Sequence, residues 1–204
     1  MPIRCSGHLI RSLGTAACDD AADWSEALAT RLLKTIWPAA ILLGVLSSIA
    51  LAAQDKYTVR VPNGLAFSDF RGYENWEDVA VSETETGIKV IVANPTMMAA
   101  YRDGLPADGK KFPDGSKIAK IEWTAKRNGA SPYFVMVPDT LKSVAFIEKD
   151  TKRFPDTHGW AYAEFLYDAA SETFRANGND AKYGYECHSR MSAQDYIYTA
   201  YPQR

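Results

Sequence analysis

An apolar segment near the amino-terminal end constrains this chain more than any other feature. Residues 36–53 are almost wholly apolar, follow the basic residues Arg31 and Lys34, and include an Ala-x-Ala sequence at 50–52. A basic flank, an apolar run and small residues before a cut are typical of a secretory signal peptide. We therefore expect export, cleavage after Ala52, and a folded domain formed by residues 53–204.

An uncleaved membrane anchor is the competing interpretation, because an apolar run of about 18 residues is close to the minimum that spans a bilayer. Pro38 disrupts a helix and, together with the Ala-x-Ala exit, favours the cleaved signal. Residues 1–30 form a mixed-charge lead-in that a signal peptide does not need, and a start codon assigned too far upstream would explain it. On either interpretation, residues 1–52 are an N-terminal extension and signal outside the fold.

The cysteine count limits how the fold can be stabilised. The chain has three cysteines, and Cys5 and Cys18 precede the expected cleavage site, so only Cys187 remains in the domain. A lone cysteine cannot form a disulfide within its own chain, so the core must be stabilised by packing. Three reasons for Cys187 stay open: an inert buried thiol, a partner cysteine on another chain, or a covalently attached cofactor.

Composition and charge exclude several classes of protein. The 204 residues are 47% hydrophobic, enough for a real core, and 23 basic against 25 acidic residues leave a net charge of −2. No broad positive surface can then neutralise a run of phosphates, which argues against nucleic-acid binding. The sequence also lacks a phosphate-binding loop, a His-Glu-x-x-His zinc motif and a Gly-x-Ser-x-Gly elbow.

Hydrophobic patterns predict short alternating elements. Residues 141–147 fit either a helix or a strand. Helices are expected over 73–81 and 96–102, and strands over 88–93, 117–124, 132–137 and 160–167. Strands joined mainly by turns, with helices near the ends, indicate a single α+β domain with a mainly antiparallel β-sheet and short flanking helices.

The chemically informative segment is the run Tyr-Glu-Cys-His at residues 185–188. In a c-type haem site, Cys-x-x-Cys-His supplies two thioether bonds to the porphyrin and a histidine that becomes the proximal iron ligand. Gly184 stands at the first cysteine position, so only one thioether is available. The Cys-His pair alone also fits a buried thiol beside a surface histidine.

Several segments in order resemble the cytochrome P-460 family of small periplasmic monohaem proteins. Residues 112–123 (FPDGSKIAKIEW) are similar to the family's strand after an Asp-Gly turn. Residues 148–154 (EKDTKRF), with Gly-Trp-Ala at 159–161, are similar to its Lys-Asp-x-x-Arg-Phe and Trp-Ala block. The Cys-His pair, followed by Asp-Tyr-Ile-Tyr-Thr at 195–199, is similar to its haem-binding end. The resemblance covers most of residues 70–204.

The resemblance implies cofactor roles for three residues. His188 would be the proximal ligand of the iron, and Cys187 would form the single thioether of a haem c. Lys120 stands where cytochromes P-460 carry a lysine bonded to a meso carbon of the porphyrin.

The resemblance also makes Lys120 a candidate catalytic residue. Ala145 stands where hydroxylamine-oxidising members have a distal carboxylate. The nearby carboxylates Glu122 and Glu148 could replace it, and Glu164, a carboxylate within an apolar strand, is a further candidate for moving protons. Glu122 also fits a surface charge, and Glu164 fits either a cavity-facing group or an ion pair with a lysine.

The resemblance implies a periplasmic haem protein whose iron keeps one open position, because no second histidine or methionine is suitably spaced as a sixth ligand. His158 is expected to be a solvent-facing turn residue. An open position binds or transforms small ligands such as hydroxylamine or nitric oxide, and an oxidoreductase would need an electron-transfer partner. Family members are typically dimers, so a homodimer is expected. The alternative is a haem-free exported binding or structural module with the same fold.

Overall fold

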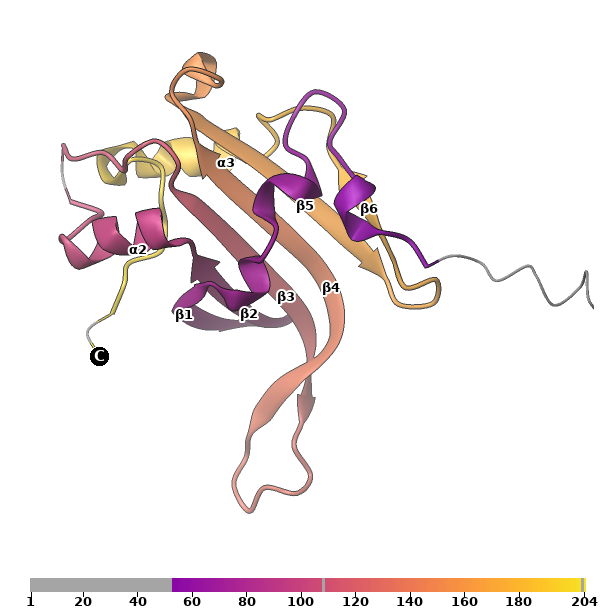
Figure 1. The fold of residues 1–204 in the computed structure, drawn as a ribbon. Coiled ribbons are helices and arrows are strands. Elements are labelled where there is room, and N and C mark those ends of the chain that lie inside the picture. Colours follow the sequence, from indigo (N-terminus) through magenta and orange to yellow (C-terminus); the bar gives the residue numbers. More distant parts are fainter. Residues whose placement is uncertain (1–52, 108, 203) are drawn as a thin grey trace, which may run out of the picture. The chain divides into compact units, whose positions relative to one another are not determined.

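Six antiparallel strands, paired in the order β1-β2-β3-β4-β5-β6, form the sheet on which the domain is built (Figure 1). Each strand therefore pairs with its neighbours in the chain, and β1 and β6 form the two edges of the sheet. The strands are β1 (Glu77–Thr84), β2 (Gly87–Ala93), β3 (Lys117–Arg127), β4 (Met136–Lys149), β5 (Trp160–Asp168) and β6 (Thr173–Asn177). This meander confirms the expected α+β domain with an antiparallel sheet.

The structure is a computed structural model that describes residues 53–107, 109–202 and 204. The expected signal peptide, Cys5 and Cys18 lie outside the described residues. Every helix in the described part of the chain is too short or too polar to cross a bilayer.

One face of the sheet is covered by the segment 53–76, drawn in indigo in Figure 1. This segment contains the short 3₁₀-helices η1 (Lys56–Thr58), η2 (Phe67–Phe70) and η3 (Tyr73–Asn75). Phe67 is fully buried, and its ring centroid lies 5.0–5.9 Å from five other aromatic rings. Two of these rings, Phe146 and Phe165, come from β4 and β5. Aromatic burial of this kind is a major stabilising contribution in a core without disulfides.

The opposite face is partly covered by α2 (Pro95–Arg102) and by the C-terminal segment. Asn94 caps α2 by accepting a hydrogen bond from the Met97 amide at 3.0 Å, and a proline follows at the first helical position. The C-terminal segment contains α3 (Tyr185–His188) and the 3₁₀-helix η5 (Ser189–Gln194), and its Ile197 is buried against the sheet. These covers do not fill the whole face.

Most of the predicted elements are confirmed. The strands at 88–93, 117–124 and 160–167 and the helix at 96–102 are present, and residues 141–147 are part of β4. The helix predicted over 73–81 is wrong, because only residues 73–75 are helical and β1 begins at Glu77. A register shift between Asp78 and Ala80 marks a bulge at Val79, which is the only buried residue of β1, so this strand lacks a two-residue alternation of buried side chains.

Two further differences concern strand ends. Residues 132–135 were predicted to be strand but lie in the β3–β4 loop, where Tyr133 and Phe134 are exposed. β6 was not predicted, because only Phe174 among its five residues is buried and the hydrophobic pattern is correspondingly weak.

Candidate functional site

A cavity of about 430 Å³ lies between the sheet and the C-terminal segment, on the face opposite the segment 53–76. Isoleucines from three neighbouring strands line its floor: Ile91, Ile118 and Ile147. The C-terminal segment contributes the other wall, including His188, Ile197 and Tyr198. The cavity is therefore mostly apolar, as small-molecule and cofactor sites usually are.

Strand register brings two predicted site residues to this cavity. Lys120 pairs with Ala145 across β3 and β4, and Ala145 pairs with Glu164 across β4 and β5. Residues paired directly across antiparallel strands point to the same face of a sheet. Lys120 and Glu164 consequently flank Ala145, and all three line the cavity.

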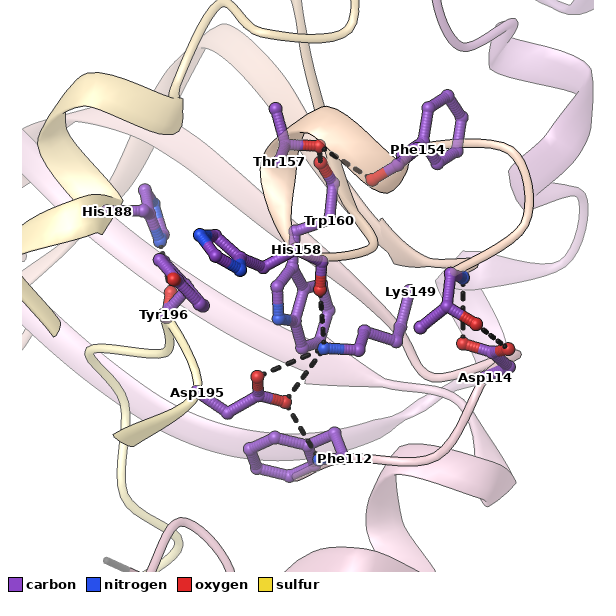
Figure 2. A network of polar contacts seen from close by, with 11 residues as sticks. Phe112, Asp114, Lys149, Phe154, Thr157, His158, Trp160, His188, Asp195 and Tyr196 are labelled. Carbon is purple, nitrogen blue, oxygen red and sulfur yellow. Dashed lines mark hydrogen bonds and ion pairs between the residues drawn. The ribbon is translucent and has the colours of Figure 1, made fainter. Parts of the chain in front are cut away.

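His188 is held in a definite orientation. Its Nδ1 lies 2.6 Å from the backbone carbonyl oxygen of Tyr196, which can only accept a hydrogen bond, so Nδ1 is the donor (Figure 2). In the neutral ring Nε2 then has no proton and offers its lone pair. The ring packs beside Tyr162 and Tyr198, with centroid separations of 4.7 and 5.1 Å.

Burial lowers the pKa of His188 below its ordinary value of 6.5. The hydrogen bond to the Tyr196 carbonyl raises this pKa, and the nearby charge of Lys120 lowers it. The net result favours the neutral imidazole at neutral pH. A neutral ring with one nitrogen anchored to a backbone carbonyl has the form in which histidine binds metals in proteins.

Gly184 and Cys187 both precede His188, Gly184 as the N-cap of α3 and Cys187 within that helix. Cys187 is exposed, and its carbonyl accepts a hydrogen bond of 2.6 Å from the Tyr198 hydroxyl. A Cβ atom on Gly184 would lie 3.0 Å from two carbons of the Tyr162 side chain. The Tyr162 ring thus packs directly against the position where a second thioether cysteine would stand.

Glu164 is part of a polar cluster at the wall of the cavity. Its Oε2 accepts hydrogen bonds from the Asn177 amide at 2.7 Å and from the Tyr183 hydroxyl at 3.1 Å. Among the described residues, Glu164 makes no ion pair with a lysine, so the cavity-facing interpretation holds there. Burial raises the pKa of Tyr183, and the charge of Glu164 raises it further, so this hydroxyl stays protonated as a donor.

The structure does not place Glu122 in the lining of the cavity. Its carboxylate contacts Lys142 at 2.6 Å and Lys89 at 3.4 Å. Burial alone would raise the pKa of Glu122, but the hydrogen bond from Lys142 and the two lysine charges lower it overall. Glu122 therefore forms an ionised cluster beside the cavity.

His158 is exposed at the turn before β5, as the sequence predicts. Its ring stacks on that of Tyr196 with a centroid separation of 5.1 Å and an interplanar angle of 16°. It is outside the lining of the cavity that contains His188.

Sequence reasoning gave no role to several groups that shape the site. The Tyr196 carbonyl is a backbone group, so its role cannot be predicted from residue types. Asn177 and Tyr183 reach Glu164 from β6 and from the connection after it, and β6 was itself not predicted. Tyr162 lies in the strand predicted over 160–167, and it both contacts His188 and lines the cavity.

A comparison with known protein families indicates what this cavity binds. The cytochrome P460 family model matches residues 70–199, which is more than half of the chain. The chain belongs to the cytochrome P460 family. A comparison with curated proteins found no match. Membership of the cytochrome P460 family assigns haem and iron binding to this protein and confirms the resemblance noted in the sequence.

The residues present fit a haem. The cavity offers an apolar floor, an imidazole with a free Nε2, and a thiol on the residue next to that imidazole. The hydroxyl of Tyr162 is buried without a hydrogen-bond partner among the described residues, so a bound group could satisfy it. Within residues 53–107, 109–202 and 204, no three His, Cys, Asp or Glu side chains gather to hold a metal. His188 is the histidine that lines the cavity.

Proposed function

We propose that this cytochrome P460 protein binds one haem through His188 and Cys187 and uses an open iron position to bind or oxidise small nitrogen species such as hydroxylamine or nitric oxide. The observation that carries the proposal is the His188 Nδ1 contact of 2.6 Å with the Tyr196 carbonyl, which leaves Nε2 unprotonated beside an apolar cavity. When bound, haem supplies a coordination site and one-electron redox chemistry.

Cys187 supplies one covalent attachment. With a haem in the cavity, its thiol would add across a vinyl group: the sulfur would bond to one vinyl carbon and the proton would go to the other, with no net oxidation. Exposure of Cys187 leaves the thiol accessible for this reaction. Gly184 cannot supply a second bond, and the Tyr162 side chain packs at that position. We therefore expect a single thioether.

Glu164 and Lys120 give the cavity its acid–base groups. The hydrogen bonds from Asn177 and Tyr183 both reach Oε2 of Glu164, so Oε1 remains available to accept a proton. Ala145 lies between Glu164 and Lys120 in the cross-strand row and leaves space there because its side chain is small. Glu164 is thus the residue that would take a proton from a small N–H or O–H donor.

Lys120 is the amine that the cavity offers for a bond to the porphyrin. Replacing an N–H and a ring C–H by an N–C bond removes two electrons and two protons, so this bond requires an oxidant such as hydrogen peroxide. The test compares Cys187→Ser with Cys187→Ser/Lys120→Ala after peroxide treatment. Haem that resists acid–acetone extraction only when Lys120 is present supports the bond, and equal extraction from both excludes it.

The direct test of haem binding is to express the protein in a host with an active cytochrome c maturation system. We expect a Soret band and a covalent mass increase of one haem, with Cys187→Ser losing the mass increase but keeping dissociable haem. A colourless, folded, monodisperse wild-type protein would instead favour the haem-free exported binding or structural module.

Export to a periplasm is part of the proposal and is supported by the Ala-x-Ala exit at residues 50–52. N-terminal sequencing of protein from its native host should begin at or within a few residues of Ala53. Intact soluble cytosolic protein beginning near Met1 would contradict it. The proposal also includes an electron-transfer partner and a homodimer, and sedimentation of the haem-loaded protein tests the second.

A further inference from the structure

A buried ion pair connects the sheet to the segment that follows His188. Lys149, at the end of β4, has an exposed side-chain fraction of 1%, and Asp195 one of 2%. The Lys149 ammonium lies 3.0 Å from both carboxylate oxygens of Asp195 and donates a further hydrogen bond to the His158 carbonyl at 3.0 Å (Figure 2). Asp195 also accepts the Phe112 amide proton at 2.9 Å. Four separate parts of the chain therefore meet at this pair.

The backbone beside the ion pair adopts an unfavourable conformation. Asp195 and Tyr196 both have positive φ angles, of 48° and 67°. Aspartate tolerates the left-handed region moderately well, but a bulky residue such as tyrosine rarely enters it. Such a conformation persists only where surrounding contacts hold it. Here the contacts are the Lys149–Asp195 pair and the packing of the Tyr196 ring against the rings of both His158 and Tyr185.

This conformation determines where the Tyr196 carbonyl points, and that carbonyl is the hydrogen-bond acceptor for His188 Nδ1. The helix α3, which carries His188, has only four residues and no side-chain cap at its N-terminus. A helix this short has little rigidity of its own. The orientation of the His188 ring therefore depends on residues 195–196 more than on α3.

A buried ion pair is an inefficient way to stabilise a fold, because desolvation of two charges offsets their attraction. Burial lowers the pKa of Lys149 even though Asp195 counteracts it. Apolar side chains of similar size would stabilise the core at least as well. The pair therefore contributes to the structure through the directions of its hydrogen bonds rather than through its net energy.

We propose that Lys149 and Asp195 are positioning residues for His188, acting through the Tyr196 carbonyl to keep the imidazole protonated on Nδ1 and its Nε2 free. The inference rests on the proposed role of His188 as iron ligand and assigns its orientation to a contact from the far end of β4. Outer partners of this kind typically change metal affinity about 10–100-fold.

The test measures the tautomer of His188 in the haem-free protein by long-range ¹⁵N–¹H NMR. The wild type should show protonation on Nδ1 only. Asp195→Asn keeps an oxygen acceptor for Phe112 and suits a left-handed residue, and Lys149→Met/Asp195→Asn removes both charges at similar volume. Each variant should show a mixture of tautomers, because the Tyr196 carbonyl is no longer held in place.

Glu148→Gln is the matched control. Glu148 neighbours Lys149, is 7% exposed and pairs with Lys117 at 3.1 Å, but it alternates to the opposite face of β4. It should lose stability while keeping the wild-type tautomer. Variants at 149 and 195 that fold and retain only the Nδ1-protonated form would overturn the proposal, as would an equal tautomer change in Glu148→Gln.

A second measurement separates this inference from the proposed function. In a Cys187→Ser background, haem transfer to an acceptor apoprotein should be about 10–100-fold faster when Lys149→Met/Asp195→Asn is added. An unchanged transfer rate would contradict the positioning role. If the wild type binds no haem at all, the proposed function fails, while the tautomer measurement still decides whether Lys149 and Asp195 orient His188.

Discussion

The two faces of the sheet are built from the same strands but have different purposes. On the face covered by residues 53–76, Phe67, Phe146 and Phe165 are fully buried and pack ring against ring. On the other face, the same strands carry Lys120 and Glu164 beside a cavity of about 430 Å³. Alternation along β4 places Phe146 on one face and Ala145 on the other. One face therefore packs wholly against the aromatic cluster around Phe67, whereas the other is divided between a second buried cluster, which includes Trp160, and the cavity.

Substitutions in the aromatic core should have the largest effect on stability. Phe67→Ala removes the ring that contacts five others, and burial of this kind costs about 3–5 kcal/mol when lost. Ile91→Ala on the cavity floor should cost about 1 kcal/mol, since Ile91 is only partly buried. Urea denaturation of the haem-free protein measures both. Equal losses would contradict the division between the two faces.

Replacing the Glu164 carboxylate should leave the fold intact and slow hydroxylamine oxidation. Glu164→Gln keeps an oxygen that can accept hydrogen bonds from Asn177 and Tyr183 but cannot take up a proton. If Glu164 is the proton acceptor, hydroxylamine oxidation by the haem-loaded protein should fall about 10²–10⁴-fold. Glu122→Gln is the control, because Glu122 binds Lys142 and Lys89 outside the cavity. Equal rates for wild type and Glu164→Gln would remove Glu164 from the mechanism.

Restoring a cysteine at position 184 should raise covalent haem attachment and lower stability, and both effects should be smaller than those above. Gly184→Cys offers a second thioether and should raise covalent haem occupancy. Its Cβ would crowd the Tyr162 side chain at 3.0 Å, so the haem-free variant should lose about 1–3 kcal/mol of stability. Gly184→Ala, which adds the same Cβ without a thiol, should show the loss without the gain. No loss in either variant would show that Tyr162 moves aside freely.

Acidification should have the smallest effect on the stability of the domain. The pKa of His188 is below 6.5 in the folded domain, so the unfolded chain takes up a proton first as the pH falls. The contribution of neutral His188 to stability is present above pH 6.5 and is lost as the pH falls toward the folded pKa. Haem-free wild type should therefore lose more stability on acidification than His188→Asn. Parallel pH profiles would contradict the burial of a neutral imidazole.

The sequence predicted the parts of this protein that depend on local patterns. Alternation identified the strands at 88–93 and 160–167, and the Cys-His pair with its flanking blocks indicated the family. The helix predicted over 73–81 failed because a bulge in β1 disturbs the alternation from which strands are recognised. β6 was missed because Phe174 is the only buried residue of this strand.

The candidate site was predictable as a list of residues but not as an arrangement. Lys120, Glu164 and His188 could be named, yet only strand register shows that the first two flank Ala145. The acceptor for His188 Nδ1 is a backbone carbonyl, and its direction follows from positive φ angles at Asp195 and Tyr196. No residue type encodes such a direction, because it arises from contacts between distant segments.

Iron ligation by His188 is the central claim, and resonance Raman spectroscopy of the ferrous haem-loaded protein tests it most directly. We predict an iron–imidazole stretching band in the wild type that disappears in His188→Gly and returns when imidazole is added, because the vacated cavity can admit the free ring. Cys187 should still hold the haem in that variant. A wild-type band that persists unchanged in His188→Gly would contradict the account.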